Sequence, residues 1–329
     1  MAIKIIGTGR YVPEVIADNE DFAKIVDTSD EWITTRTGIK TRHITNGVLA
    51  FQMGAKASEQ AIKRAGIEAE EIDMILATTV TPDCLTPSLA CLVGQELGIE
   101  SAACMDLNAA CAGYVFALDV AQKYLDSGCA KTILIVSSEI ITRMVDYSDR
   151  GTCVLFGDGA AATVVTKGEG LYSCVLKGKP QGAVKIFTKL PEPKNPFSDK
   201  PFDWGYDEMN EAPTGYMQMA GNDVYKFATV AMPEAVELAA EQAGLKVEDL
   251  DLIIPHQANI RIVQTAIKRL KLPAERFYIN IQDFGNISSA CIPLALSQLD
   301  EQGRLKKGDK ICVVGFGAGL TYGASIFEW

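Results

Sequence analysis

The sequence predicts an α/β protein that consists of two repeated halves, and three pairs of similar segments indicate this fold. Residues 61–77 (AIKRAGIEAEEIDMILA) and residues 239–255 (AAEQAGLKVEDLDLIIP) lie 178 positions apart. Both read as a helix end capped by glycine, a short loop and a buried strand. Two further pairs of apolar segments follow in the same order: Met105–Asn108 with Phe277–Asn280, and Lys131–Ser138 with Lys310–Phe316. This rhythm is typical of α/β folds, although short helix-to-strand sequences also resemble one another by chance.

The repeat predicts two domains of similar size. Residues 1–170 form the first half and residues 171–329 the second, with the boundary near Lys167–Tyr172. The segment 178–215 departs from the repeat, because it is rich in proline, glycine and charged residues. We interpret this segment as a surface insertion beside the mouth of a site or at an interface.

Composition and charge limit the class of protein. The net charge of −11 disfavours a protein that binds duplex nucleic acid. The nine cysteines are odd in number and form no C-x-x-C pair, which favours reduced thiols in a cytoplasmic protein. With only two histidines, a structural zinc site is disfavoured. The sequence contains no signal peptide pattern and no apolar run of about 18 residues, so we expect no membrane span.

Cys111 is the first candidate for chemistry. It follows the predicted strand at 105–108 and precedes a helix with an apolar stripe, within Asn108-Ala-Ala-Cys111-Ala-Gly. A cysteine at a helix N-terminus is favoured as a thiolate by free N–H groups and the helix dipole. Small neighbours would let a substrate carbonyl approach closely. The alternative is a buried structural cysteine, an interpretation that suits the other eight.

The two histidines differ in their surroundings. His256 follows the predicted strand that ends at Pro255, and open α/β sheets build their sites at this end of a strand. A single histidine is also often structural. His43 lies in Thr-Arg-His-Ile without such a context, and we interpret it as structural.

Asn286 lies in another loop that leads into a helix, at a repeat position that roughly matches Cys111. The two loops would then face one another across a pseudo-twofold axis, although helix N-capping alone also explains an asparagine here. The segment Gly315-Phe-Gly-Ala-Gly319 reads as a glycine-rich turn between two strands. Such turns expose N–H groups that hold an oxyanion or a phosphate, but no lysine follows as in a P-loop.

Cysteine, histidine and asparagine in this order resemble the thiolase superfamily, and within it the β-ketoacyl-[acyl-carrier-protein] synthase III family. The resemblance runs nearly from end to end of the chain. It rests on these motifs: Glu-Trp32-Ile-x-x-Arg36-Thr-Gly-Ile, Arg42-His-Ile, Asn-Ala-Ala-Cys111-Ala-Gly, Asp149-Arg150-Gly-Thr, Phe-Gly-Asp158-Gly-Ala, Met219-Ala-Gly-Asn222-Asp-Val, His256-Gln-Ala-Asn259-Ile-Arg261 and Gly-Asn286-x-Ser. It implies a thiolase-like fold with α-β-α-β-α layers, and a cytoplasmic homodimer.

The resemblance also implies the reaction. An acyl-CoA primer would acylate Cys111, and malonyl-[acyl-carrier-protein] would then enter and lose CO₂. His256 and Asn286 would stabilise the enolate, which attacks the acyl group to give 3-oxoacyl-[acyl-carrier-protein]. The N–H groups of Cys111 and Ala318 would form an oxyanion hole. This is the initiating condensation of type II fatty-acid synthesis; it implies a CoA thioester as substrate and no cofactor.

Further roles follow from the same resemblance. Residues implied in CoA binding are Trp32, Arg36, Arg150, Asn222, Asn259 and Phe316. The carrier protein is acidic, so a basic face on this acidic chain would bind it; the candidates are Lys226, Arg261, Lys268, Arg269 and Lys271. An ordinary solvated helix face is the alternative for these basic residues.

Three departures from the family pattern affect these expectations. Ala318 stands where many relatives have a third glycine, and its methyl group could narrow the site. The 178–215 segment is longer than in compact members. Thr86 stands where some members have a phenylalanine that closes the acyl pocket, so we predict primers longer or more branched than acetyl. A strict preference for acetyl in a panel of primers would contradict this prediction.

Three alternative functions share these residues. A relative could join or transfer acyl groups in secondary metabolism or hydrocarbon synthesis with the same three residues. A thiol hydrolase would use Cys111 with His256 as a general base and would release free acid without malonyl-[acyl-carrier-protein]. A catalytically silent scaffold would retain normal function after replacement of Cys111.

Overall fold

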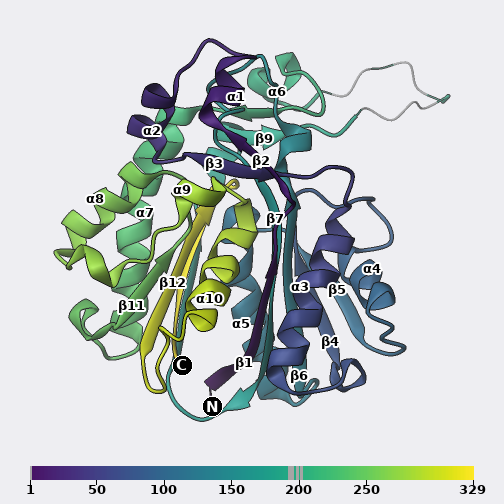
Figure 1. Ribbon diagram of the computed structural model, residues 1–329, viewed down its shortest axis with the longest axis vertical. Coiled ribbons are helices and arrows are strands. Elements are labelled where there is room, and N and C mark those ends of the chain that lie inside the picture. The colour runs from purple at the N-terminus through teal and green to yellow at the C-terminus, as the bar shows by residue number, and fades with distance from the viewer. Residues whose placement is uncertain (1, 192–195, 198–199, 201–202) are drawn as a thin grey trace.

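The chain folds into five layers in which helices and sheets alternate, as the computed structural model shows (Figure 1). The structure describes residues 2–191, 196–197, 200 and 203–329. In order of packing, the layers are an outer helix pair, a five-stranded sheet, a central helix pair, a four-stranded sheet and a second outer helix pair. The thiolase-like α/β fold with two repeated halves is therefore confirmed.

The first sheet is built from the first half of the chain. Its strands, in spatial order, are β1 (Ala2–Tyr11), β7 (Asp158–Gly168), β6 (Thr132–Ile140), β4 (Met74–Thr78) and β5 (Ala103–Leu107). Strand β4 runs parallel to both β5 and β6, whereas β7 runs antiparallel to β6 and β1. The outer helices α3 (Ala50–Ala65) and α4 (Leu89–Glu96) bury their apolar side chains against this sheet.

The second sheet repeats this plan with the second half. Its strands, in spatial order, are β11 (Leu252–Pro255), β12 (Lys310–Gly317), β13 (Thr321–Glu328) and β8 (Tyr172–Gly178). The outer helices α7 (Gly221–Gln242) and α8 (Ile260–Leu270) cover it. The strands of the two sheets fall on either side of residue 170, and the division into two domains there stays a prediction.

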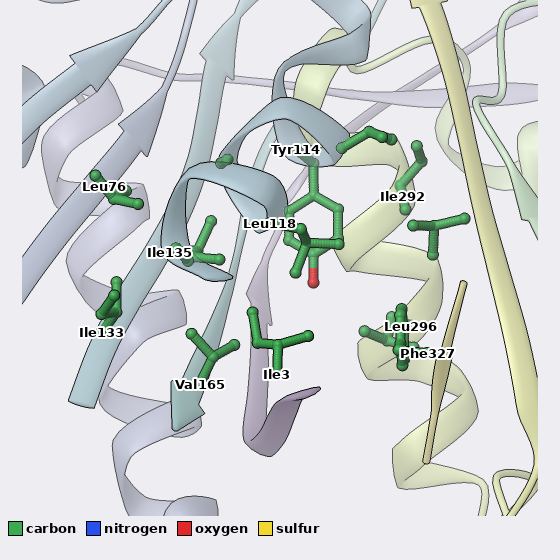
Figure 2. Close-up of a cluster of buried hydrophobic side chains, with 14 of the residues drawn as sticks. Ile3, Leu76, Tyr114, Leu118, Ile133, Ile135, Val165, Ile292, Leu296 and Phe327 are labelled. Atoms are coloured by element: carbon green, nitrogen blue, oxygen red, sulfur yellow. The ribbon is translucent and has the colours of Figure 1, made fainter. Parts of the chain in front are cut away.

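The core of the protein lies between the two sheets. Helices α5 (Gly113–Ser127) and α10 (Cys291–Glu301) form the central layer. Tyr114 and Leu118 on α5 pack with Ile292 and Leu296 on α10, and all four are fully buried (Figure 2). Burial of each such side chain stabilises the fold by about 1.5–3 kcal/mol. This layer holds the N-termini of α5 and α10 at a fixed separation.

The two halves match in register. Met74 on β4 faces Ile133 on β6, and Leu252 on β11 faces Ile311 on β12. Each residue of the second pair lies 178 positions after its counterpart, which is the spacing of the sequence repeat. Equivalent positions of the two halves can therefore be identified residue by residue.

The strand predicted at Phe277–Asn280 is not formed as a regular strand in the structure. Of the segment Phe277–Asn280, only Phe277 makes a β-bridge, with Ile253. The buried side chain of Gln257 makes hydrogen bonds that a neighbouring strand would otherwise make. Its Nε2 donates to the carbonyl of Tyr278 at 3.1 Å, and its Oε1 accepts from the Asn280 N–H at 3.2 Å. A buried amide that both donates and accepts can substitute for a neighbouring strand.

Shorter elements gather at the upper end of the sheets in Figure 1, whereas both termini lie at the lower end. These elements are β2 (Val15–Asp18), α1 (Asn19–Ala23), α2 (Asp30–Thr37), β3 (Thr41–Ile44), β9 (Ile186–Thr188), α6 (Asp207–Glu211), β10 (Met217–Met219) and α9 (Ile281–Phe284). In the 178–215 segment, residues 192–195, 198–199 and 201–202 lie outside the described part. No helix among the described residues is long and apolar enough to cross a membrane.

Candidate active site

A cavity of about 950 Å³ lies at the upper end of the sheets, where the chain leaves β5 and β11. Its wall contains most of the residues that the sequence singles out: Trp32, Arg36, Cys111, Arg150, Asn222, His256, Asn259, Arg261, Asn286, Phe316 and Ala318. The structure thus brings residues from both halves of the chain to one cavity. Their catalytic and binding roles stay predictions.

Cys111 lies on a tight turn between β5 and α5. The turn is a 3-10 helix, η2 (Ala110–Ala112), so the α-helix begins two residues after Cys111. Ala110 has a φ of 46°, in the left-handed region. Behind the turn, a Cβ on Gly317 would lie 2.7 Å from the nitrogen of Cys111. Only glycine leaves the N–H group of Cys111 free on this side, which a donor to a substrate oxyanion requires.

The thiol of Cys111 is protonated in the resting protein. Burial raises the pKa of this thiol to about 12, with a smaller contribution in the same direction from the Glu139 carboxylate. The Ser288 hydroxyl acts in the opposite direction and lowers the pKa of Cys111. Burial therefore opposes the thiolate that the nearby helix N-terminus would favour.

The rate of Cys111 alkylation by iodoacetamide is expected to rise about tenfold per pH unit from pH 7 to 10 without a plateau. The reason is that only the thiolate reacts, and its fraction rises with pH until the pKa of about 12 is reached. Peptide mass spectrometry of the Cys111 peptide measures this rate, with a free model thiol as the control. A plateau below pH 9 would contradict the assigned protonation state.

His256 follows the last residue of β11 and is buried. Its backbone N–H donates to the backbone carbonyl of Val314 at 2.8 Å. Its imidazole ring packs edge to face against the ring of Phe316, with 5.2 Å between the ring centroids. Burial lowers the pKa of His256 to about 3. The imidazole is therefore neutral and weakly basic at pH 7, which suits a hydrogen-bond donor better than a general base.

The carboxamide of Asn286 is oriented by its neighbours. Its Oδ1 accepts the N–H of Ser288 at 2.8 Å and the S–H of Cys291 at 3.9 Å. The backbone of Asn286 is fixed by hydrogen bonds to Leu155 and Gly157. Because both neighbours donate to the oxygen, the amide nitrogen is the group left to donate into the cavity.

The repeat position assigned to Asn286 requires a correction. At the spacing of 178, the counterpart of Cys111 is Ser289, and the counterpart of Asn286 is Asn108. The second turn is also a 3-10 helix, η7 (Ser288–Ala290), and Ser288 has a φ of 49° like Ala110 before Cys111. Asn286 therefore lies three residues before Ser289, the position that is equivalent to Cys111.

The glycine-rich segment forms the end of β12 and the turn to β13. Ala318 lines the cavity directly after Gly317. The hydroxyl of Thr321 donates to the carbonyls of Ala318 at 3.0 Å and of Ala109 at 3.2 Å, so it links this turn to the segment before Cys111. The backbone of the glycine-rich turn is thereby held beside the nucleophile.

Trp32, Arg36 and Arg150 lie together at the mouth of the cavity. The guanidinium groups of Arg36 and Arg150 lie 4.5 Å and 5.1 Å from the indole centroid of Trp32. Arg150 also donates to the carbonyl of Asp27 at 2.7 Å. An aromatic plane beside two cations suits a ligand with an aromatic base and phosphates.

Other predicted residues lie outside the cavity. Thr86 is exposed and is not among the residues that line the cavity. Its role in the acyl pocket stays a prediction. Lys226, Lys268 and Arg269 are exposed on α7 and α8. His43 stacks on Phe284, and its Nδ1 lies 2.6 Å from the carbonyl of Pro13, which agrees with a structural role.

The sequence alone did not identify several residues of the site. Ser288 lies beside the Cys111 thiol, and Ile186, Phe187 and Met217 from β9 and β10 line the cavity. The repeat would have located Ser288 as the counterpart of Ala110. No periodic signal marks the residues on β9 and β10, since these strands have three residues each.

Comparison with known proteins places the chain beside one group of enzymes. The family models described as "3-Oxoacyl-[acyl-carrier-protein (ACP)] synthase III" and its "C terminal" part match residues 105–179 and 240–329. Proteins named beta-ketoacyl-[acyl-carrier-protein] synthase III are 46% identical in Clostridium acetobutylicum and 43% identical in Fusobacterium nucleatum, each over 100% of this chain and 99% of the relative. The crystal structure of 3-oxoacyl-[acyl-carrier-protein] synthase III from Aquifex aeolicus VF5 has a TM-score of 0.90 and 39% identity, over 100% of both chains.

Proposed function

The chain belongs to the β-ketoacyl-[acyl-carrier-protein] synthase III family, and from this premise we propose how its cavity carries out the reaction. The enzyme is a condensing acyltransferase that starts fatty-acid synthesis. The overall reaction joins an acyl-CoA primer to malonyl-[acyl-carrier-protein] and gives 3-oxoacyl-[acyl-carrier-protein], CO₂ and CoA. The observation that carries this proposal is that Cys111, His256 and Asn286, from the two halves of the chain, line one cavity.

The first step is the transfer of the acyl group to Cys111. The sulfur attacks the thioester carbonyl, the bond between the carbonyl carbon and CoA sulfur breaks, and the thiol proton leaves with CoA as CoASH. The N–H groups of Cys111 and Ala318 donate to the oxyanion that forms on the carbonyl oxygen. The thiol has a raised pKa, so deprotonation and attack must occur together rather than from a stored thiolate.

The second step is the decarboxylation of the malonyl group. His256 and the Asn286 amide nitrogen donate to the thioester oxygen of malonyl-[acyl-carrier-protein] as the bond to CO₂ breaks. Two neutral donors stabilise the enolate without transferring a proton to it, which keeps the carbanion available. The neutral imidazole that burial maintains fits this role.

The third step forms the carbon–carbon bond. The enolate carbon attacks the acyl-Cys111 carbonyl, and the same two backbone N–H groups hold the tetrahedral oxyanion. The Cys111 sulfur leaves and takes up a proton, which restores the resting thiol. All steps use protein groups and the two thioesters, so the proposal requires no resident cofactor.

Replacing Trp32 with alanine is expected to raise the KM for acyl-CoA about tenfold and to change kcat by less than about threefold. Trp32 lies at the mouth of the cavity and would contact the nucleotide part of CoA, which binds equally in the ground and transition states. Steady-state kinetics with varied acyl-CoA measure the effect, with Trp204→Ala as the control. A fall in kcat at unchanged KM would contradict this placement.

We further propose that the exposed basic residues Lys226, Arg261, Lys268 and Arg269 bind the acidic carrier protein. Arg269 donates to the carbonyl of Thr229 at 2.8 Å, which ties α8 to α7 one turn after Lys226. These residues therefore lie on neighbouring helices, and Arg261 also reaches the wall of the cavity. The homodimer stays a proposal; it would bury Leu85, which is 76% exposed in the loop of Thr86.

The function is tested by incubating the protein with an acyl-CoA and malonyl-[acyl-carrier-protein] and identifying the products. The proposal expects 3-oxoacyl-[acyl-carrier-protein], CO₂ and CoASH in equal amounts. Release of free acid without dependence on malonyl-[acyl-carrier-protein] would instead support a thiol hydrolase. The lowered pKa of His256 disfavours that alternative, because a hydrolase needs this residue as a general base.

A further inference from the structure

The twofold repeat gives the catalytic centre a counterpart inside the same chain. At the spacing of 178, Ser289 is the counterpart of Cys111, and Thr78 is the counterpart of His256. Glu139 on β6 is the counterpart of Gly317 on β12. The glycine that leaves the Cys111 N–H free is thus replaced, in the counterpart, by a carboxylate.

In the turn of Ser289, the Glu139 carboxylate occupies the position that corresponds to the oxyanion site in the turn of Cys111. Its Oε1 accepts the hydroxyl of Ser289 at 2.7 Å and the N–H of Ser289 at 3.4 Å. In the catalytic centre, the equivalent N–H is that of Cys111, and a Cβ on Gly317 would lie only 2.7 Å from this nitrogen. The side chain of Glu139 therefore fills a pocket that the catalytic centre leaves for substrate.

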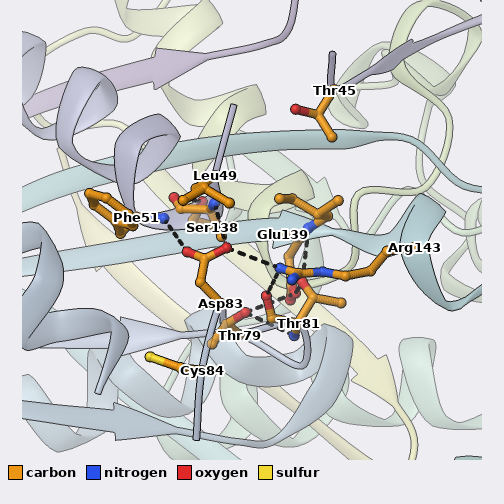
Figure 3. Close-up of polar contacts among 12 residues, drawn as sticks. Thr45, Leu49, Phe51, Thr79, Thr81, Asp83, Cys84, Ser138, Glu139 and Arg143 are labelled. Atoms are coloured by element: carbon orange, nitrogen blue, oxygen red, sulfur yellow. Dashed lines mark hydrogen bonds and ion pairs between the residues drawn. The ribbon is translucent and has the colours of Figure 1, made fainter. Parts of the chain in front are cut away.

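The second oxygen of Glu139 holds the loop that follows β4. Its Oε2 accepts the Val80 N–H at 3.0 Å and the hydroxyls of Thr81 at 2.8 Å and Thr79 at 3.2 Å (Figure 3). Glu139 is fully buried, so these donors replace the water that the carboxyl group loses. Burial raises the pKa of this carboxyl, and the hydrogen bonds from Ser289, Val80 and Thr81 act in the opposite direction. Five donors from two segments converge on this one side chain.

The loop after β4 is itself held from the other side. Arg143 donates to the carbonyl of Thr81 and forms an ion pair with Asp83 at 3.3 Å. Asp83 accepts the N–H groups of Ala50 and Phe51 and so caps α3 (Figure 3). The network connects Glu139 to the rigid outer layer of the first half.

This network ends beside the Asn286 amide. Ser289 lies next to Ser288, whose N–H fixes the Oδ1 of Asn286. We propose that Glu139 is a positioning residue: by filling the counterpart of the oxyanion pocket, it fixes the segment 286–289 of the second half against the first half and aims the Asn286 amide at the cavity. This inference rests on the role proposed above for Asn286.

The proposal distinguishes the two half-reactions. Decarboxylation and condensation use the Asn286 amide, whereas acylation of Cys111 uses the N–H groups of Cys111 and Ala318. A displaced segment 286–289 therefore slows the reaction with malonyl-[acyl-carrier-protein] more than it slows acylation, which this segment affects only through Ser288 beside the Cys111 thiol.

Glu139→Ala removes the side chain that fills this pocket, and Glu139→Gln is the conservative variant that keeps it. If the glutamine oxygen faces Val80, its NH₂ group faces Ser289, whose hydroxyl can accept while donating to the Thr78 carbonyl at 3.2 Å. Only the long bond from the Ser289 N–H is lost. Ser289→Ala removes the partner hydroxyl, and the double variant shows whether the two act as one unit.

Ser138→Ala is the matched control. Ser138 precedes Glu139 on β6 and is equally buried, but its hydroxyl donates to the carbonyl of Ala50 at 2.6 Å, away from the cavity. Thermal unfolding of each variant separates a loss of stability from a loss of function. Wild-type protein in each assay shows whether the proposed reaction occurs at all, independently of Glu139.

Acylation of Cys111 is measured by intact mass after rapid mixing with acyl-CoA, and condensation by the rate at which malonyl-[acyl-carrier-protein] discharges the acyl-enzyme. We expect Glu139→Ala and Ser289→Ala each to slow discharge about tenfold or more, to change acylation less than about threefold, and to be non-additive in the double variant. Glu139→Gln and Ser138→Ala should both stay close to wild type. Equal losses in both half-reactions, or unchanged discharge in both Glu139→Ala and Ser289→Ala, would overturn the proposal.

Discussion

Replacing Cys111 with serine is expected to lower the rate of acyl-enzyme formation by about 10³-fold or more. Cys111 is the residue of the cavity whose N–H is left free by Gly317, and its sulfur is the proposed nucleophile. A serine hydroxyl has a much higher pKa than a thiol, and His256 is a poor base to activate it, because burial lowers the pKa of its imidazole to about 3. The measurement is the mass of the protein after incubation with acyl-CoA.

The control for this variant is Cys129→Ser, which replaces an exposed cysteine that does not line the cavity. This control should acylate at the rate of the wild type. If Cys111→Ser turned over normally, the protein would be a scaffold, or its nucleophile would lie elsewhere.

Replacing His256 with alanine is expected to lower the rate of condensation about 10²–10³-fold, the usual cost of one lost oxyanion donor. The imidazole is buried and neutral, and it shares the cavity with the Asn286 amide. Acylation of Cys111 should change little, because the proposed oxyanion hole for that step consists of backbone N–H groups. The two rates are measured separately, by intact mass and by the discharge of isolated acyl-enzyme.

The pH dependence of condensation gives a second test of His256. Because its pKa is lowered to about 3, its protonation should not limit the reaction between about pH 5 and 8. His43→Ala is the control, since His43 lies against Phe284 outside the cavity. A His256→Ala variant that lost acylation and condensation equally would indicate a general base and contradict the donor role.

The fold could be predicted from the sequence because the repeat defines the order of helices and strands in both halves. The segments 61–77 and 239–255 reappear as helix ends followed by β4 and β11 in the same register. The strand predicted at Phe277–Asn280 failed because the side chain of Gln257 supplies its hydrogen bonds. A side chain that replaces a strand leaves no pattern in hydrophobic periodicity.

The site was predictable to the extent that its residues lie at strand ends. Cys111 and His256 each follow a strand, β5 and β11, whereas Asn286 follows the short helix α9. The strand ends therefore indicated the first two residues, and Asn286 was indicated by its loop before a helix. The protonation of Cys111 was not, because burial is a property of the assembled fold.

The most direct test of the account is a peptide map of the protein after incubation with acyl-CoA and then with malonyl-[acyl-carrier-protein]. We expect one acyl group per chain, on the peptide that contains Cys111, and its loss when malonyl-[acyl-carrier-protein] is added. An acyl group on another cysteine, or turnover with no acyl group on Cys111, would contradict the central claim that this sulfur carries the primer to the enolate.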